Sequence, residues 1–252
     1  MNKKFGAQLY TLREELKTDY PAVFRELKKM GWAGVQLSAL PEGYDPHEVS
    51  ALLRETGLRT AGIHVSLDRL TRELDSVLEE VHLYNTRDIV CPNLPDEYRS
   101  AEGYRYVRQV LNDIVDRAKG FRISYHNHAF EFETKVYGLS ALEYLLEPTY
   151  ENMILAEIDV YWVKKGGYDP LQFIQQYAGR MPIIHLKDMT ADEYQTFAEV
   201  GTGLIDFEPI LKWGERSGVE WYVVEQDQCQ GNPMDSLEIS LNNLNRLSKQ
   251  LA

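Results

Sequence analysis

Short apolar segments alternate with longer amphipathic segments along the whole chain. Eight apolar segments are present, each bounded by glycine, proline or polar residues, and the central ones are rich in β-branched residues, as buried parallel strands are. They are FGAQLYTL from Phe5, GVQLSAL from Gly34, RTAGIHVSL from Arg59, DIVCPNL from Asp88, FRISYHNH from Phe121, ILAEIDVYW from Ile154, PIIHLKDM from Pro182 and WYVVEQDQ from Trp221. The pattern predicts eight strands, the sixth of which extends to Trp162.

The segments between these strands have the apolar periodicity of helices packed on a core. Helices are expected over residues 20–30, 46–56, 68–83, 104–119, 139–146, 169–178, 207–217 and 236–251. Asp45, Asp169 and Asp206 stand where helix N-caps belong. Each predicted strand is therefore followed by at least one predicted helix.

Eight strand–helix units in succession predict parallel strands joined by right-handed crossovers. Eight such units in about 250 residues are typical of a closed (β/α)8 barrel. An open doubly wound sheet is the alternative, but it needs a glycine-rich phosphate-binding turn after the first strand, and QLYTLREE from Gln8 contains no glycine. No linker interrupts the pattern, so we expect an α/β protein with a single TIM-barrel domain over residues 1–252.

Composition and charge narrow the class of protein. The 252 residues are 44% hydrophobic and 26% charged, and the net charge is 27 − 39 = −12. This charge repels phosphate backbones, so a nucleic-acid partner is not expected. No segment resembles a signal peptide or approaches the roughly 18 apolar residues of a spanning helix, so no membrane association is expected. Two distant cysteines, Cys91 and Cys229, predict reduced thiols in a cytoplasmic protein.

Polar side chains follow every predicted strand, at the end where barrel enzymes place their active sites. In strand order they are Gln8 and Tyr10; Gln36 and Ser38; His64; Cys91 and Asn93; His126, Asn127 and His128; Glu157, Asp159 and Trp162; His185, Lys187 and Asp188; and Glu225, Asp227 and Gln228. The acids and histidines of the last strands would converge at the barrel mouth. A mixed oxygen and nitrogen set suits one divalent metal ion: Mn²⁺, Zn²⁺, Co²⁺, Fe²⁺ or Mg²⁺.

Several of these residues also have a purely structural interpretation. His64 could be a hydrogen-bonded lining residue, and Lys187 and Asp188 could form a salt bridge at the rim. Glu157 alternates with Asp159 along the strand, so both should point the same way unless the strand bends. The acids could likewise be paired with lysine and arginine in a barrel that is metal-free and non-catalytic, which is the alternative from another functional class.

Motifs at these strand ends resemble those of the sugar isomerase/epimerase superfamily with a xylose isomerase-like TIM barrel, which includes inosose dehydratases, ketose 3-epimerases and endonuclease IV. They are GAQLYTLR, YHNHAFEF, EIDVYWV, IIHLKD, EVGTGLIDF and YVVEQD. The resemblance implies that Asp159, His185 and Glu225 are metal ligands. Many relatives have Glu-Asn-His where this chain has His126-Asn127-His128, so either His126 or Glu131 completes the set. We expect Glu131, because another carboxylate keeps the charge and hardness of the site.

The resemblance implies an isomerase or epimerase that removes a proton α to a carbonyl of a sugar, keto-sugar or inosose, through a metal-stabilised enediolate. Glu225 is the expected base on one face, and Glu131 or His126 on the other, with Lys187 as a further catalytic residue. His64, His128, Trp162 and Gln8 are the expected substrate-binding residues.

Three alternatives remain at this point, one of them a metal-free, non-catalytic sugar-binding barrel whose acids are paired with lysine and arginine. A dehydratase or lyase acting on an inosose or a 3-keto-glycoside would use the same proton abstraction. An endonuclease IV-like nuclease needs three zinc ions and more ligands than six histidines in an acidic chain provide. The expected partner is a small sugar or polyol, and assembly into a homo-oligomer is left open.

Overall fold

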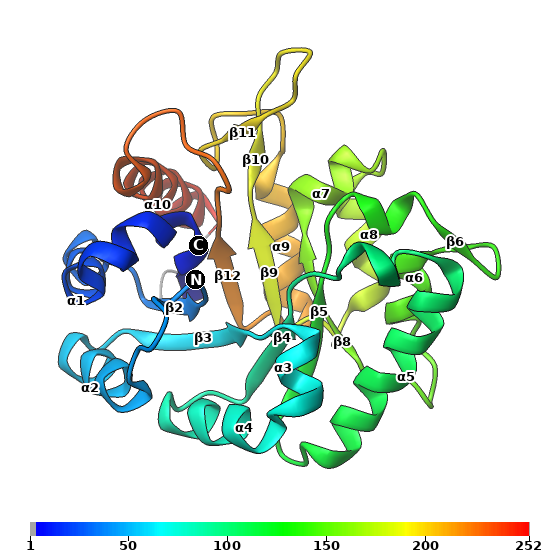
Figure 1. Cartoon of the computed structure of the whole chain (residues 1–252). Helices are drawn as coiled ribbons and strands as arrows, with labels where there is room; N and C mark the ends of the chain where they lie inside the picture. The colour runs from blue at the N-terminus through cyan, green and yellow to red at the C-terminus, as the bar shows by residue number, and fades with distance from the viewer. Residues whose placement is uncertain (1–3, 252) are drawn as a thin grey trace.

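The computed structural model describes residues 4–251, and eight of its strands close into a parallel barrel (Figure 1). The strands neighbour one another in the order β1, β12, β9, β8, β5, β4, β3, β2, with β2 returning to β1. Their bounds are β1 Phe5–Gln8, β2 Gly34–Leu37, β3 Arg59–His64, β4 Asp88–Cys91, β5 Arg122–His126, β8 Leu155–Asp159, β9 Ile183–Leu186 and β12 Trp221–Val224. The predicted (β/α)8 barrel is confirmed, and the open doubly wound alternative is wrong.

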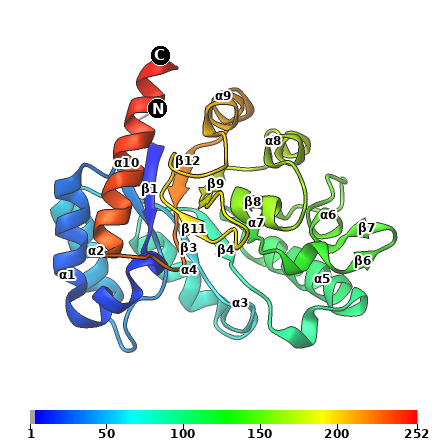
Figure 2. The ribbon, with the colours of Figure 1, turned by 90° about the horizontal axis from the view of Figure 1, so that it is seen from above.

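Helices surround the barrel on its outer side, as the two perpendicular views show (Figures 1 and 2). They are α1 Arg13–Met30, α2 Pro46–Thr56, α3 Leu67–Arg72, α4 Leu74–Leu83, α5 Ala101–Arg117, α6 Ala141–Leu146, α7 Val160–Lys165, α8 Pro170–Ile174, α9 Phe207–Ser217 and α10 Pro233–Gln250. In both views α1, α2 and α10 lie on one side of the barrel and α5, α6 and α8 on the other. None of the helices within residues 4–251 has the length and apolar content needed to cross a membrane.

Side-chain caps fix several helix starts where the sequence predicts them. The carboxylates of Asp45, Asp169 and Asp206 accept hydrogen bonds from the backbone N–H groups of the first turns of α2, α8 and α9. Asp19 does the same for Ala22 N at 2.9 Å, because α1 is kinked at Asp19. The helix predicted over residues 20–30 is therefore present, and a further helical segment precedes it.

The structure departs from the sequence pattern in three places. The helix predicted over residues 68–83 is divided at Glu73 into α3 and α4. Two small hairpins, β6 Lys135–Val136 with β7 Leu139–Ser140 and β10 Asp188–Met189 with β11 Phe197–Ala198, are inserted after β5 and β9. The sixth barrel strand ends at Asp159, since its carboxylate caps the short helix α7 through the N–H groups of Tyr161 and Trp162.

The barrel interior is apolar away from the mouth and polar toward the carboxyl ends of the strands. Ala61, Val90, Ile183, Trp221 and Val223 form a small cluster of buried apolar side chains, separate from the large core that the helices cover. Toward the carboxyl ends of the strands the register pairs His126 with Glu157 and Asp159 with His185. The polar ends of neighbouring strands therefore lie at similar heights in the barrel mouth.

Candidate metal centre and active site

Six acid and histidine side chains meet at the carboxyl ends of five barrel strands. They are His64 from β3, His126 from β5, Glu157 and Asp159 from β8, His185 from β9 and Glu225 directly after β12. Two overlapping sets could hold a metal ion, and both contain His126 and His185. One set adds His64 and Glu157 and the other adds Asp159 and Glu225, with the ligand atoms of each set within 4.8 Å of one another. This spacing is close to twice a metal–ligand distance of about 2.1 Å.

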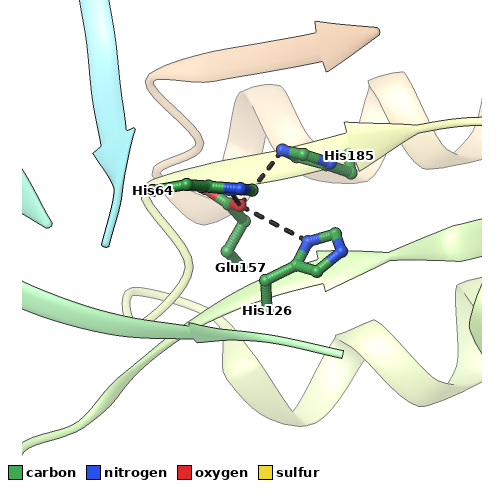
Figure 3. Close-up of side chains that lie close together, drawn as sticks. All are labelled: His64, His126, Glu157 and His185. Carbon is green, nitrogen blue, oxygen red and sulfur yellow. Dashed lines mark hydrogen bonds and ion pairs between the residues drawn. The ribbon is translucent and has the colours of Figure 1, made fainter. Parts of the chain in front are cut away.

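Glu157 lies at the centre of the first set, and neighbouring side chains of the protein contact both oxygens of its carboxylate. The three imidazole rings of the set gather around its carboxylate, as Figure 3 shows. Oε1 lies 2.7 Å from Nε2 of His64 and 3.0 Å from Nε2 of His185, and Oε2 accepts a 2.5 Å hydrogen bond from Gln36 Nε2. Burial opposes the negative charge, but His185 and His64 outweigh it and hold the pKa of Glu157 well below its usual range. Both oxygens are thus already engaged.

The second set contains one buried nitrogen that makes no hydrogen bond. Oδ1 of Asp159 is used by the cap of α7 and Oδ2 is paired with Nζ of Lys187 at 3.0 Å. Nδ1 of His126 makes no hydrogen bond within the described chain and lies 3.4 Å from Oε1 of Glu157. Both residues are at most 2% exposed, and an unsatisfied buried polar atom is costly. Burial raises the pKa of Asp159 to about 6 and lowers that of His126 to about 3. His126 is therefore neutral at pH 7, the form in which histidine binds a metal.

Lys187 is a fully buried cation beside this set. Its Nζ lies 3.0 Å from Oδ2 of Asp159, 2.9 Å from Oε2 of Glu225 and 2.5 Å from Oδ2 of Asp227. Burial disfavours its charge, but these three carboxylates raise its pKa well above the usual range. Lys187 is thus a permanently charged group, and the alternative of a rim salt bridge with Asp188 is wrong.

Asp188 instead has a structural role. Its carboxylate accepts hydrogen bonds from the backbone N–H groups of Gly201, Gly203 and Ile205 at 2.9–3.0 Å. These residues belong to the EVGTGLIDF motif, so the aspartate fixes the loop that follows β11.

The cluster carries more negative than positive charge. Four carboxylates and one lysine meet here: Glu157, Asp159, Glu225, Asp227 and Lys187. With neutral histidines the sum is −4 + 1 = −3. Burial opposes a proton on His185, but Glu157 and Glu225 outweigh burial and raise the pKa of His185 to about 10. With this proton the sum becomes −2. A divalent cation would bring the unprotonated set to −1, so the buried charges favour a bound cation.

The structure does not bring Glu131 to this cluster, contrary to the sequence expectation. The chain turns after β5 into a short 3-10 helix, Phe130–Phe132, which directs Glu131 away from the mouth. Its carboxylate is fully buried and accepts hydrogen bonds from Tyr125 Oη at 2.7 Å and from the His128 backbone N–H at 2.8 Å. His126, the alternative first ligand, lies in the cluster in its place.

The pH dependence of stability tests whether the carboxylate of Glu131 is buried in this way. Burial raises the pKa of Glu131 from 4.5 to about 7, despite its hydrogen bonds. The folded chain therefore binds a proton that the unfolded chain has lost, and its stability falls as pH rises through this window. Between pH 4.5 and 8, metal-free wild-type protein should lose stability that Glu131→Gln does not lose. The free energy of unfolding of the variant, relative to that of the wild type, should therefore increase by up to about 3 kcal/mol over this range. Urea denaturation measures it, and a pH-independent difference would contradict the burial of this carboxylate.

A cavity of about 270 Å³ opens above the cluster. His64, His126, His128 and Glu225 line it together with Tyr10, Ser38, Ala39, Pro92, Asn93 and Asp227. Burial, followed by the positive charges around it, lowers the pKa of His128 to about 2, so His128 presents a neutral imidazole to the cavity. Of the residues expected to bind substrate, His64 and His128 therefore reach the cavity.

The other two expected substrate-binding residues lie outside the cavity lining. Gln8 is fully buried below it and donates to Oε1 of Gln36 at 2.6 Å. Trp162 stands behind the lining, with its ring centroid 5.4 Å from Nζ of Lys187 and 5.4 Å from the His128 ring.

The sequence predicted that Glu157 and Asp159 point the same way. It did not predict the layer of Gln8, Gln36 and Glu157 beneath the ligands, because this layer joins three strands that are distant in sequence.

Comparisons with known proteins agree with the barrel fold. Residues 24–247 match the family described as xylose isomerase-like TIM barrel. An inosose dehydratase of Geobacillus kaustophilus is 26% identical over 91% of this chain and 87% of its own length. An inosose dehydratase of Clostridium beijerinckii is 29% identical over 55% of this chain, and that match spans only 52% of the relative. The crystal structure of a sugar phosphate isomerase/epimerase from Parabacteroides distasonis has a TM-score of 0.78 at 22% identity, covering 97% of this chain and 94% of its own.

Proposed function

The chain belongs to the xylose isomerase-like TIM barrel family, and we propose that it is a metal-dependent enzyme that removes a proton from the carbon beside a carbonyl of a sugar, keto-sugar or inosose. One observation carries the proposal. The four residues of the second set bring buried ligand atoms within 4.8 Å of one another in a cluster with excess negative charge, at the floor of a cavity in the barrel mouth. A cavity of about 270 Å³ is near the lower end of small-molecule sites, which suits a single sugar ring.

The residues of the second set fit a divalent cation better than those of the first. His126, Asp159, His185 and Glu225 would hold it, since this set supplies two carboxylates to balance a divalent charge, whereas the other set supplies Glu157 alone. When bound, the cation supplies Lewis-acid polarisation of a substrate oxygen. Glu157 would then orient a ligand, because its carboxylate lies beside Nε2 of His185 and leaves Nδ1, on the Glu225 side, for the metal.

The chain's own groups supply the acid–base chemistry. Glu225 lines the cavity and is 5% exposed, so one of its oxygens can take a proton from a bound sugar. Lys187 adds a fixed positive charge 2.9 Å from the Glu225 carboxylate, which keeps this base ionised. The neutral imidazole of His128 lines the cavity, where Glu131 does not reach, and would form a hydrogen bond with a substrate oxygen there. The low-dielectric surroundings strengthen each of these interactions.

A dehydratase is the second candidate, and the inosose dehydratase relatives favour it. It shares the first step with an isomerase or epimerase, namely the removal of a proton beside the carbonyl. The two differ only in the second step, because a dehydratase loses a hydroxyl from the neighbouring carbon, whereas an isomerase or epimerase returns a proton to the adjacent or the same carbon. The residues named above serve either outcome.

A substrate screen in deuterium oxide tests the proposal. Inososes, 3-keto-glycosides and free ketoses are incubated with protein reconstituted with Mn²⁺, Co²⁺, Zn²⁺, Fe²⁺ or Mg²⁺, and deuterium at the carbon beside the carbonyl is followed by proton NMR. We expect exchange with at least one class, accompanied by epimer, isomer or dehydrated product. Absence of exchange in every class would contradict the proposal.

A further inference from the structure

A second cavity of about 550 Å³ adjoins the one in the barrel mouth. It is formed by α3, by the loop and 3-10 turn that follow β4 and by Tyr106 of α5, on the same face of the barrel as the candidate active site. Pro92 and Asn93 line both cavities, so the two spaces share a wall. The functional assignment above leaves this larger space without a role.

The lining of the second cavity combines aromatic faces with polar groups. Tyr98 and Tyr106 stack nearly parallel, with centroids 5.8 Å apart and an interplanar angle of 10°, and Tyr106 is 51% exposed. The exposed ring of Tyr106, supported by the half-buried ring of Tyr98, provides a flat apolar surface for a ligand ring beside a polar groove. Asn93 and Asp68 add hydrogen-bonding groups to the same lining. The combination suits a ring that has both apolar faces and hydroxyl groups.

The charge of the lining excludes an anionic ligand. Asp68 and Glu97 contribute two negative charges, and the cavity's one lysine or arginine side chain, Arg72, is paired with Asp68 at 2.9 Å. A phosphate group would meet net negative charge there, in a chain whose total charge is −12. A neutral ring is therefore the ligand that this surface fits.

The wall between the cavities is held in a fixed position. Arg99 donates to the carbonyl of Leu94 at 2.9 Å, and its guanidinium lies 3.8 Å from the centroid of Phe130. The Phe130 ring in turn stacks on His128, with centroids 5.4 Å apart and an angle of 9°. The loop that carries Pro92 and Asn93 is thus tied to a residue of the active-site cavity, so both spaces keep one relative geometry.

We propose that the second cavity is a subsite for a neutral ring attached to the reacting sugar, which makes the substrate class a keto-glycoside rather than a free monosaccharide or inosose. The inference rests on the proposed function, because the sugar in the mouth is the group that undergoes chemistry. It adds that a sugar or aryl aglycone packs on Tyr106 and Tyr98, beyond Pro92 and Asn93.

A matched pair of substrates tests the subsite. Methyl and phenyl 3-keto-glucosides, in both anomers, differ only in the presence of the ring. The ratio of kcat/KM for deuterium incorporation, phenyl over methyl, should be about tenfold in the wild type. Tyr106→Ala should lower this ratio to within twofold of unity, and Tyr106→Phe should retain it because the ring is kept. Tyr150→Ala, at a tyrosine that is 99% exposed, is the control and should match the wild type.

The outcomes separate this inference from the proposed function. Equal kcat/KM for the two glycosides in the wild type, or a ratio that Tyr106→Ala leaves unchanged, overturns the subsite while the proposed function stands. If neither glycoside exchanges deuterium, calorimetric binding of the same pair decides. Tighter binding of the phenyl glycoside that is lost in Tyr106→Ala supports the subsite, and equal affinity or no binding overturns it.

Discussion

Replacing Glu225 with glutamine is expected to lower the rate of deuterium incorporation into a keto-sugar substrate by at least about 1000-fold. The side chain lines the active-site cavity and is the carboxylate best placed to accept a proton there. Burial opposes its ionisation, but Lys187 and His185 outweigh burial and hold the pKa of Glu225 well below its usual range. The base is therefore ionised at neutral pH, whereas an amide of the same shape cannot accept the proton.

The measurement is single-turnover exchange by NMR with metal-saturated protein, so that a weaker metal affinity of the variant does not set the rate. Glu133→Gln is the matched control, because Glu133 directly follows the YHNHAFEF motif of the site histidines but is exposed to solvent. We expect Glu133→Gln to exchange at the wild-type rate. An exchange rate of Glu225→Gln within tenfold of the wild type would assign the base to another residue.

Replacement of a metal ligand should greatly weaken the binding of the metal ion. His185→Ala and Asp159→Ala are each expected to weaken Mn²⁺ binding by at least about 100-fold, because replacement of groups that merely support a ligand already costs 10–100-fold. Elemental analysis after dialysis and calorimetric titration with Mn²⁺ measure the loss. His82→Ala is the control, since His82 is an exposed histidine on α4.

The same titration decides between the two candidates for the first ligand. His126→Ala should lose Mn²⁺ binding, because His126 lies in the cluster and its Nδ1 makes no hydrogen bond within the described chain. Glu131→Gln should keep it, because the carboxylate of Glu131 is engaged by Tyr125 and the His128 backbone. Wild-type metal content in His185→Ala or Asp159→Ala would contradict the metal centre, and the reverse pattern for His126 and Glu131 would restore the sequence expectation.

Periodicity and capping residues predicted most of the fold. All eight barrel strands and the starts of α2, α8 and α9 follow from local signals, namely an apolar run or an aspartate before a helix. The end of the sixth strand did not follow, because VYWV after Asp159 is apolar throughout and is equally consistent with a strand or a helix. The capping of α7 by Asp159 decides between them, and it depends on the turn that the chain makes at the barrel mouth.

The sequence predicted those site residues whose position depends only on the end of a single strand. Asp159, His185 and Glu225 each lie at or near the carboxyl end of a strand, and barrel closure places them together. Glu131 lies five residues beyond His126, in a turn whose direction is set by hydrogen bonds to Tyr125 and to a backbone amide. The contacts of Glu157 with His64 and Gln36 join strands far apart in sequence, so a single strand's pattern carries no trace of them.

The dependence of proton exchange on metal tests the central claim most directly. Protein treated with a chelator is incubated in deuterium oxide with the best substrate of the screen, before and after addition of one equivalent of Mn²⁺, and deuterium at the carbon beside the carbonyl is measured by NMR. The account predicts that chelation abolishes exchange, that one equivalent of a divalent cation restores it, and that Asp159→Ala shows no restoration. Exchange that continues at an unchanged rate in chelated protein would contradict it.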